Sequence, residues 1–147
     1  MAAGDSATTA WDKITGFDVA DGTLLSDVLN FDGTAAVSAF TATEDVGVIK
    51  SHSITAGYAS FDDVADYSTA LVINSANLAD VVAYLATNTA TNGTVAFAYD
   101  SDASGTADAT MVFHNGTTDD LVMLVGITSG SLSATLTTTT AGTIGIA

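Results

Sequence analysis

Three apolar segments separated by short polar turns decide the fold of this chain: TVAFAYD over residues 94–100, DATMVFHNG over 108–116 and DDLVMLVGI over 119–127. Val, Phe, Tyr and Thr are enriched in β-strands because their side chains pack well on a pleated surface. Asn115 and Gly116, after the second segment, tolerate positive φ and therefore favour a tight hairpin. The three segments predict an antiparallel β-meander.

The segments before and after the meander also favour short strands. Residues 12–31 place apolar pieces between Asp and Gly, and residues 34–54 partly alternate apolar with small polar side chains. Both patterns are typical of short strands joined by tight turns. The Thr-rich segment 131–147 is compatible with a last strand or with a loosely held terminus.

Residues 61–87 differ because their apolar side chains recur near helical spacing. Within this range, one face carries Leu78, Val81, Val82 and Leu85, and Asn74 or Ser75 is placed to cap the helix start. No composition break or Pro-rich linker divides the chain, so residues 1–147 are taken as one domain. The predicted fold is mainly β, a sandwich or irregular β-roll with an antiparallel C-terminal meander, and with one or two short helices around 61–87.

The charge of the chain excludes several classes of partner. Seventeen acidic residues stand against two lysines and no arginine, so the formal net charge is −15 at pH 7. Proteins bind nucleic acid by neutralising phosphates with Lys and Arg, so we expect no nucleic-acid partner. No segment approaches the apolar length that spans a bilayer, so we expect no membrane insertion. Cysteine is absent, which excludes disulfides and thiolate metal sites.

Residues 100–108, with the sequence DSDASGTAD, connect the first two segments of the meander and carry the clearest candidate site. Oxygen-bearing residues at alternate positions around a glycine are the pattern by which a short loop surrounds Ca²⁺. The candidate ligands are the side chains of Asp100, Asp102, Ser104 and Asp108 and the carbonyl of Thr106. Met111 stands where an EF-hand has its glutamate, so the loop is closer to non-helical DxDxSG loops. The alternative is a polar hairpin turn whose aspartates cap backbone amides.

A second acidic region lies near the start of the sequence, where short apolar pieces separate the residues Asp12, Asp18, Asp21, Asp27 and Asp32. If these pieces pair as strands, several carboxylates lie along one edge and repel each other unless a cation lies between them. Solvated turn aspartates that need no ligand are an equally good interpretation.

The sequence contains no recognisable catalytic motif. There is no GxSxG nucleophile elbow and no phosphate-binding loop. His52 and His114 have neither a pairing motif nor a third ligand at zinc spacing, so we interpret them as packing or surface residues. We therefore expect that the chain is not an enzyme.

Two segments resemble a known family. Residues 12–31, DKITGFDVADGTLLSDVLNF, are similar to the segment that follows calcium repeats in bacterial RTX and S-layer-like proteins exported by type I secretion. Residues 94–135 are similar to the C-terminal stretch of such proteins. No nonapeptide calcium repeat occurs, so the chain departs from a regular calcium β-roll.

The resemblance implies a non-catalytic, calcium-stabilised extracellular module of a type I secreted surface protein, with a structural or export role. It also implies Ca²⁺ ligation by Asp12, Asp21, Asp100, Asp102 and Asp108. The sequence opens without a basic segment followed by an apolar run, so we expect no cleavable N-terminal signal. Expected partners are calcium, cell-surface components or further copies of the chain.

Two other functions remain open at this point. A self-assembling surface-layer or filament subunit would use Thr- and Ala-rich strand edges as contacts. A carbohydrate- or surface-binding module would use the stacking face of an aromatic side chain, for which the candidates are Trp11, Tyr58, Tyr67 and Tyr99.

Overall fold

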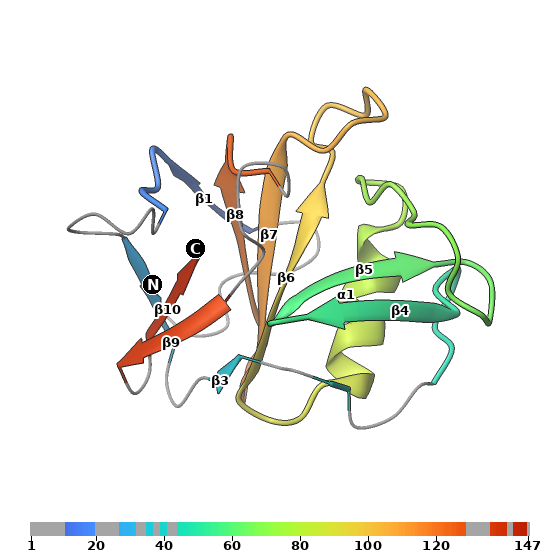
Figure 1. The fold of residues 1–147 in the computed structure, drawn as a ribbon, viewed down its shortest axis with the longest axis horizontal. Helices are drawn as coiled ribbons and strands as arrows, with labels where there is room; N and C mark the ends of the chain where they lie inside the picture. Colours follow the sequence, from blue (N-terminus) through green and yellow to red (C-terminus); the bar gives the residue numbers. More distant parts are fainter. Residues whose placement is uncertain are drawn as a thin grey trace.

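The fold is mainly β with one short helix (Figure 1). It is seen in a computed structural model, which describes residues 11–19, 27–31, 35–36, 39–40, 44–128, 136–140 and 143–146. The described strands are β1 Asp12–Thr15, β2 Val28–Asn30, β3 Ala35–Ala36, β4 Ser51–Thr55, β5 Tyr58–Asp62, β6 Gly93–Tyr99, β7 Ala109–Asn115, β8 Asp120–Val125, β9 Leu136–Thr140 and β10 Thr143–Ile146. The helix α1 spans Leu78–Asn88.

The larger sheet is mixed. Six strands follow the order β1-β8-β7-β6-β5-β4, and β3 joins the same sheet beside β6. β1 runs parallel to β8, and β3 and β5 both run parallel to β6, whereas the pairs β4–β5, β6–β7 and β7–β8 are antiparallel. β5 pairs with β6 through two residue pairs only, Tyr58 opposite Ala96 and Ala59 opposite Phe97, and β3 pairs with the start of β6.

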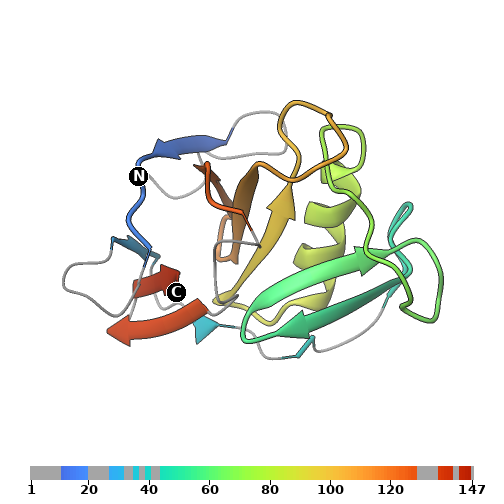
Figure 2. The same cartoon turned by 45° about the horizontal axis from the view of Figure 1, so that its top comes forward.

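The predicted C-terminal meander is confirmed. β6 and β7 pair from Gly93 opposite Asn115 to Tyr99 opposite Ala109, and β7 continues antiparallel to β8. A smaller sheet of order β2-β10-β9 lies to the left of the meander in Figures 1 and 2, while α1 lies to its right. The Thr-rich segment near the C-terminus therefore contributes two strands.

The meander strands are mostly apolar, and both of their faces are covered. Alternate residues point into a core that α1 closes, with Phe97, Met111 and Met123 as examples. The residues between them point to a second apolar cluster on the other face, to which β2 contributes Leu29. Phe31, which follows β2, is buried in the same cluster.

One helix forms in the predicted helical region, over residues 78–88. Its predicted apolar face is buried at Leu78, Val81 and Leu85. Residues 61–71, the other helical candidate, instead form the end of β5 and a loop. The Asp62 carboxylate accepts hydrogen bonds from the amides of that loop, and such local bonds compete with helix formation.

Candidate functional site

The β6–β7 loop carries the five predicted calcium ligands of residues 100–108 within one short segment. Asp100 is only 1% exposed, and its two carboxylate oxygens accept hydrogen bonds from the amides of Ser104 at 3.0 Å and Gly105 at 2.7 Å. Asp102 accepts from the same Ser104 amide at 3.0 Å. The two carboxylates therefore lie side by side and share one donor.

The remaining candidates close the same loop. The Asp108 carboxylate accepts from the Ser101 amide and the Ser101 hydroxyl, both at 2.7 Å. The Ser104 hydroxyl donates to the Thr106 carbonyl at 3.4 Å. Gly105, at the bend, has φ of +92°, a backbone conformation that glycine adopts without strain.

The carboxylates of this loop influence each other and their neighbour Tyr99. Burial acts to raise the pKa of Asp100, but the amides of Gly105 and Ser104 and the side chain of Asp102 together outweigh it, so the pKa lies below its ordinary value. The negative charge of Asp108 acts to raise the pKa of Asp100. Burial, followed by the charges of Asp100 and Asp108, raises the pKa of Tyr99.

This hydrogen bonding matches the interpretation of amide-capping aspartates, and it leaves room for a cation. A carboxylate oxygen has two lone pairs, so an oxygen that accepts one amide hydrogen bond can still coordinate a metal. Within the described parts of the chain, however, no three His, Cys, Asp or Glu side chains are grouped to hold one ion. Ca²⁺ in this loop would need serine, backbone carbonyl or water oxygens beside the carboxylates, and Ca²⁺ accepts all of these.

Of the other two predicted ligands, only Asp12 is described, and it lies away from this loop. Asp12 lies on β1 opposite Val122, whereas the loop adjoins the end of β8 near Val125. Three residues of strand, about 10 Å, separate the two positions along β8. One carboxylate oxygen of Asp12 is buried and finds no hydrogen-bond partner among the described residues. Asp21 lies outside the described residues.

Two further aspartates of the N-terminal acidic region are brought together by backbone contacts. The Asp18 amide donates to the Asp27 carboxylate, and the Asp27 amide donates to the Asp18 carbonyl, both at 2.9 Å. Asp27 therefore acts as a capping group for the chain that enters β2.

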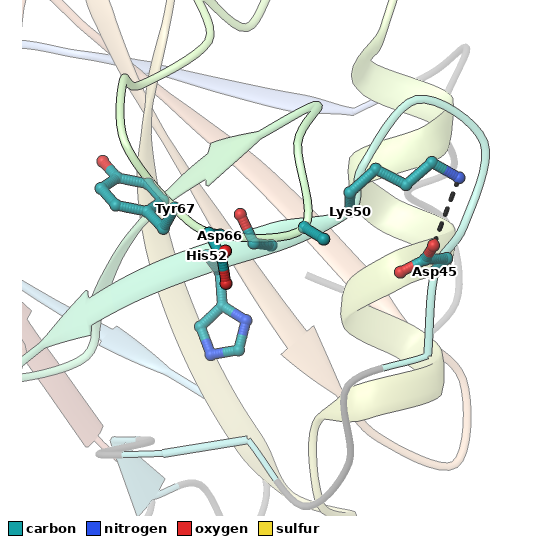
Figure 3. A pocket seen from close by; sticks show the side chains of 7 residues that line it. Asp45, Lys50, His52, Asp66 and Tyr67 are labelled. Carbon is teal, nitrogen blue, oxygen red and sulfur yellow. Dashed lines mark ion pairs between the residues drawn. The ribbon is translucent and has the colours of Figure 1, made fainter.

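A polar pocket on the β4–β5 hairpin was not predicted from the sequence. It has a volume of about 420 Å³ (Figure 3). Its lining residues come from the turn before β4, from β4 itself and from the loop after β5: Asp45, Lys50, Ser51, His52, Ala65, Asp66 and Tyr67. The pocket thus combines one ammonium group, carboxylates, a hydroxyl and an aromatic ring.

One wall of the pocket is the loop after β5, which the buried carboxylate of Asp62 organises. Asp62 is 3% exposed and accepts from the amides of Ser68 at 2.8 Å and Thr69 at 2.9 Å, as well as from Asp63 at 2.8 Å. Hydrogen bonds from Thr69 and Ser68 lead the causes that lower the pKa of Asp62 to about 2. Hydrogen bonds to the buried Asp62 carboxylate therefore hold in place the loop that carries the pocket residues Asp66 and Tyr67.

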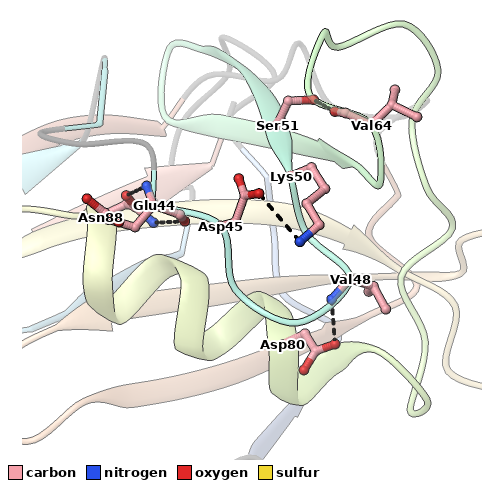
Figure 4. A network of polar contacts seen from close by, with 8 residues as sticks. All are labelled: Glu44, Asp45, Val48, Lys50, Ser51, Val64, Asp80 and Asn88. Atoms are coloured by element: carbon pink, nitrogen blue, oxygen red, sulfur yellow. Dashed lines mark hydrogen bonds and ion pairs between the residues drawn. The ribbon is translucent and has the colours of Figure 1, made fainter.

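Two side-chain contacts attach this loop to the hairpin. The Ser51 hydroxyl donates to the Val64 carbonyl at 2.6 Å (Figure 4). The Tyr67 hydroxyl shares a hydrogen bond of 2.5 Å with the Ser60 hydroxyl of β5. Both contacts hold the loop against the outer face of the hairpin.

The opposite wall is the turn before β4, which α1 holds at two points (Figure 4). Asn88, the last residue of α1, accepts from the Glu44 amide at 2.8 Å and donates to the Glu44 carbonyl at 3.2 Å. Asp80, in the first turn of α1, accepts from the Val48 amide at 3.0 Å. Lys50 pairs with Asp45 at 3.4 Å in the same turn.

Gly47 is required in this turn, so Gly47→Ala should destabilise the fold by about 1–3 kcal/mol. Its φ is +55°, and a Cβ there would lie 2.1 Å from Cγ of Asp80, which forces Asp80 away from the turn. Chemical denaturation measures the loss. Gly126→Ala is the matched control, because Gly126 also has positive φ but no atom within 4 Å of a Cβ. Equal losses in the two variants would contradict the role of the Asp80 contact.

Both histidines are engaged in packing contacts. Nδ1 of His52 lies 2.7 Å from the Tyr84 hydroxyl of α1, and its ring therefore turns from the hairpin toward the helix. Burial lowers the pKa of His52. His114 is buried, hydrogen bonded to Thr94 at 2.9 Å and stacked on Phe31. These contacts agree with the interpretation of the histidines as packing residues.

The comparisons with protein-family models, with curated proteins and with solved structures give no match to this chain. Among the described residues, no helix has the length and apolar character needed to cross a bilayer.

Proposed function

We propose that this chain is a non-catalytic extracellular module that calcium stabilises, with a structural or export role in a secreted surface protein. The observation that carries the proposal is the β6–β7 loop, where Asp100, Asp102 and Asp108 occupy one short segment. Two of these carboxylates share a single amide donor, so their negative charges are close together. A bound cation would relieve this repulsion.

The net charge of the whole chain also favours the binding of a cation. With a net charge of −15, self-repulsion opposes compaction, and a bound cation offsets part of it. An ion that binds only the folded state stabilises that state by mass action. The gain is about 2.7 kcal/mol when the free ion concentration is 100 times the dissociation constant. Folding would then follow the supply of calcium, which is plentiful outside cells.

A thermal melt with calcium or with a chelator tests this proposal. We expect the melting temperature to rise in millimolar CaCl₂ relative to EDTA, and to rise less in MgCl₂ or in NaCl of equal ionic strength. The Asp102→Asn variant should lose most of the rise, because the amide oxygen still accepts from Ser104 but the charge is gone.

Asp63→Asn is the matched control, since Asp63 is exposed and lies outside the loop. This variant removes the same charge and should retain the calcium response. A melting temperature that ignores calcium and chelator would overturn the proposal. An equal reduction of the response in both variants would do so too, because it would indicate general charge screening.

A further inference from the structure

We infer that the polar pocket beside β4 binds a neutral sugar of about monosaccharide size. Its volume of about 420 Å³ lies in the range of small-ligand sites. Figure 3 shows Tyr67 at one end, the Lys50–Asp45 ion pair at the other and Asp66 between them. This site uses none of the β6–β7 loop residues, so the inference is independent of calcium binding.

The aromatic end of the pocket is fixed in place. Tyr67 is 37% exposed, and its hydroxyl is held by the Ser60 hydroxyl at 2.5 Å. The loop that carries it is ordered by the buried Asp62 carboxylate. A partly exposed ring that is already held in place loses little mobility on binding, and such a ring can stack against the apolar C–H face of a pyranose.

The polar groups supply complementary hydrogen bonds. Lys50 is 38% exposed on its side chain and can donate to a ligand oxygen while it remains paired with Asp45. The carboxylates of Asp66 and Asp45 can accept from ligand hydroxyls. A sugar hydroxyl both donates and accepts, so a polyol satisfies both kinds of group.

The charges in the pocket select against ionic ligands. One ammonium and two carboxylates give a net charge of −1, which disfavours phosphate, sulfate and carboxylate ligands. The ammonium group and the absence of a third acidic ligand among the described lining residues disfavour a metal ion. A neutral ligand rich in hydroxyls remains as the best chemical match.

NMR titration of the full chain with D-glucose, D-galactose, D-mannose and N-acetyl-D-glucosamine tests the inference. At least one sugar should bind with a dissociation constant of about 1–10 mM, as expected for a small, open site. Saturable shifts should appear at the amides of Ser51, Asp66 and Tyr67, and not at the β6–β7 loop. D-Glucuronic acid should bind more weakly than D-glucose.

Variants locate the interaction. Tyr67→Ala and Asp66→Asn should each weaken binding about tenfold. Tyr67→Phe retains the ring and should retain most of the affinity, which separates stacking from loss of fold. Asp63→Asn, on the same loop but outside the pocket lining, should bind as the unmodified chain does.

Three results would overturn the inference. The first is no saturable shift with any of the four sugars. The second is unchanged affinity in Tyr67→Ala and Asp66→Asn. The third is tighter binding of glucuronic acid, or the same pocket shifts with CaCl₂ alone, either of which would assign the pocket to an ionic ligand.

Discussion

Replacement of Phe61 by alanine is expected to lower the free energy of unfolding by about 3–5 kcal/mol. Phe61 is fully buried and lies between two other rings, with centroids 6.0 Å from Tyr84 and 5.7 Å from Phe97, both edge-to-face. These rings join β5, α1 and β6 at the point where β5 and β6 share only two residue pairs. The loss would be a large part of the 5–15 kcal/mol that ordinarily stabilises a domain.

Denaturant titration followed by tryptophan fluorescence measures this loss. Val72→Ala is the control, since Val72 is 44% exposed and should change the free energy of unfolding by about 0.5 kcal/mol or less. A loss below about 1 kcal/mol for Phe61→Ala would show that the three rings do not form one packed core.

Replacement of Asp62 by asparagine is expected to destabilise the chain at pH 7 and to flatten its response to acid. The folded-state pKa of Asp62 is about 2, below the ordinary value of 3.8. A group with a depressed pKa contributes its full stability above the unfolded pKa and loses it as the pH falls through the folded value. The Asp62 contribution is therefore complete above pH 4 and disappears toward pH 2.

Melting temperatures between pH 7 and pH 2 test this expectation. The unmodified chain and Asp62→Asn should differ most at pH 7 and approach each other near pH 2. Asp63→Asn changes the exposed neighbour of Asp62. Its curve of melting temperature against pH should run parallel to that of the unmodified chain. Parallel curves for Asp62→Asn would mean that the buried carboxylate does not order the loop.

The meander was predictable because its signals are local. Phe97, Met111 and Met123 lie within strongly apolar segments, and the intervening turns contain Asp, Gly and Asn. The β4–β5 hairpin was missed because residues 61–71 also carry helical spacing. The Asp62 carboxylate stabilises the observed loop by accepting hydrogen bonds from its amides, and a single buried carboxylate leaves no periodic signal in the sequence.

Of the candidate sites, too, only the one formed by contiguous residues was predictable from the sequence. The β6–β7 loop was predictable as a group because its residues are contiguous, and its cation remains a prediction. The position of Asp12 depends on pairing with β8, which no short pattern reveals. The polar pocket beside β4 was missed because Lys50 and Tyr67 come from separate segments, although the alternation in SHSIT and YASFD around Ala56 and Gly57 could have indicated the hairpin.

The pairing of β1 with β8 also sets the order in which the fold can be completed. Asp12 and Val122 lie more than a hundred positions apart in the chain, and β2 pairs with β10 over a similar separation. Contacts this distant form slowly, because a long loop must close before they can stabilise anything. Whether the chain leaves a ribosome or an export channel, the meander can assemble first. The larger sheet is completed only when β1 and β8 are both available, and the smaller sheet only when β2 and β10 are.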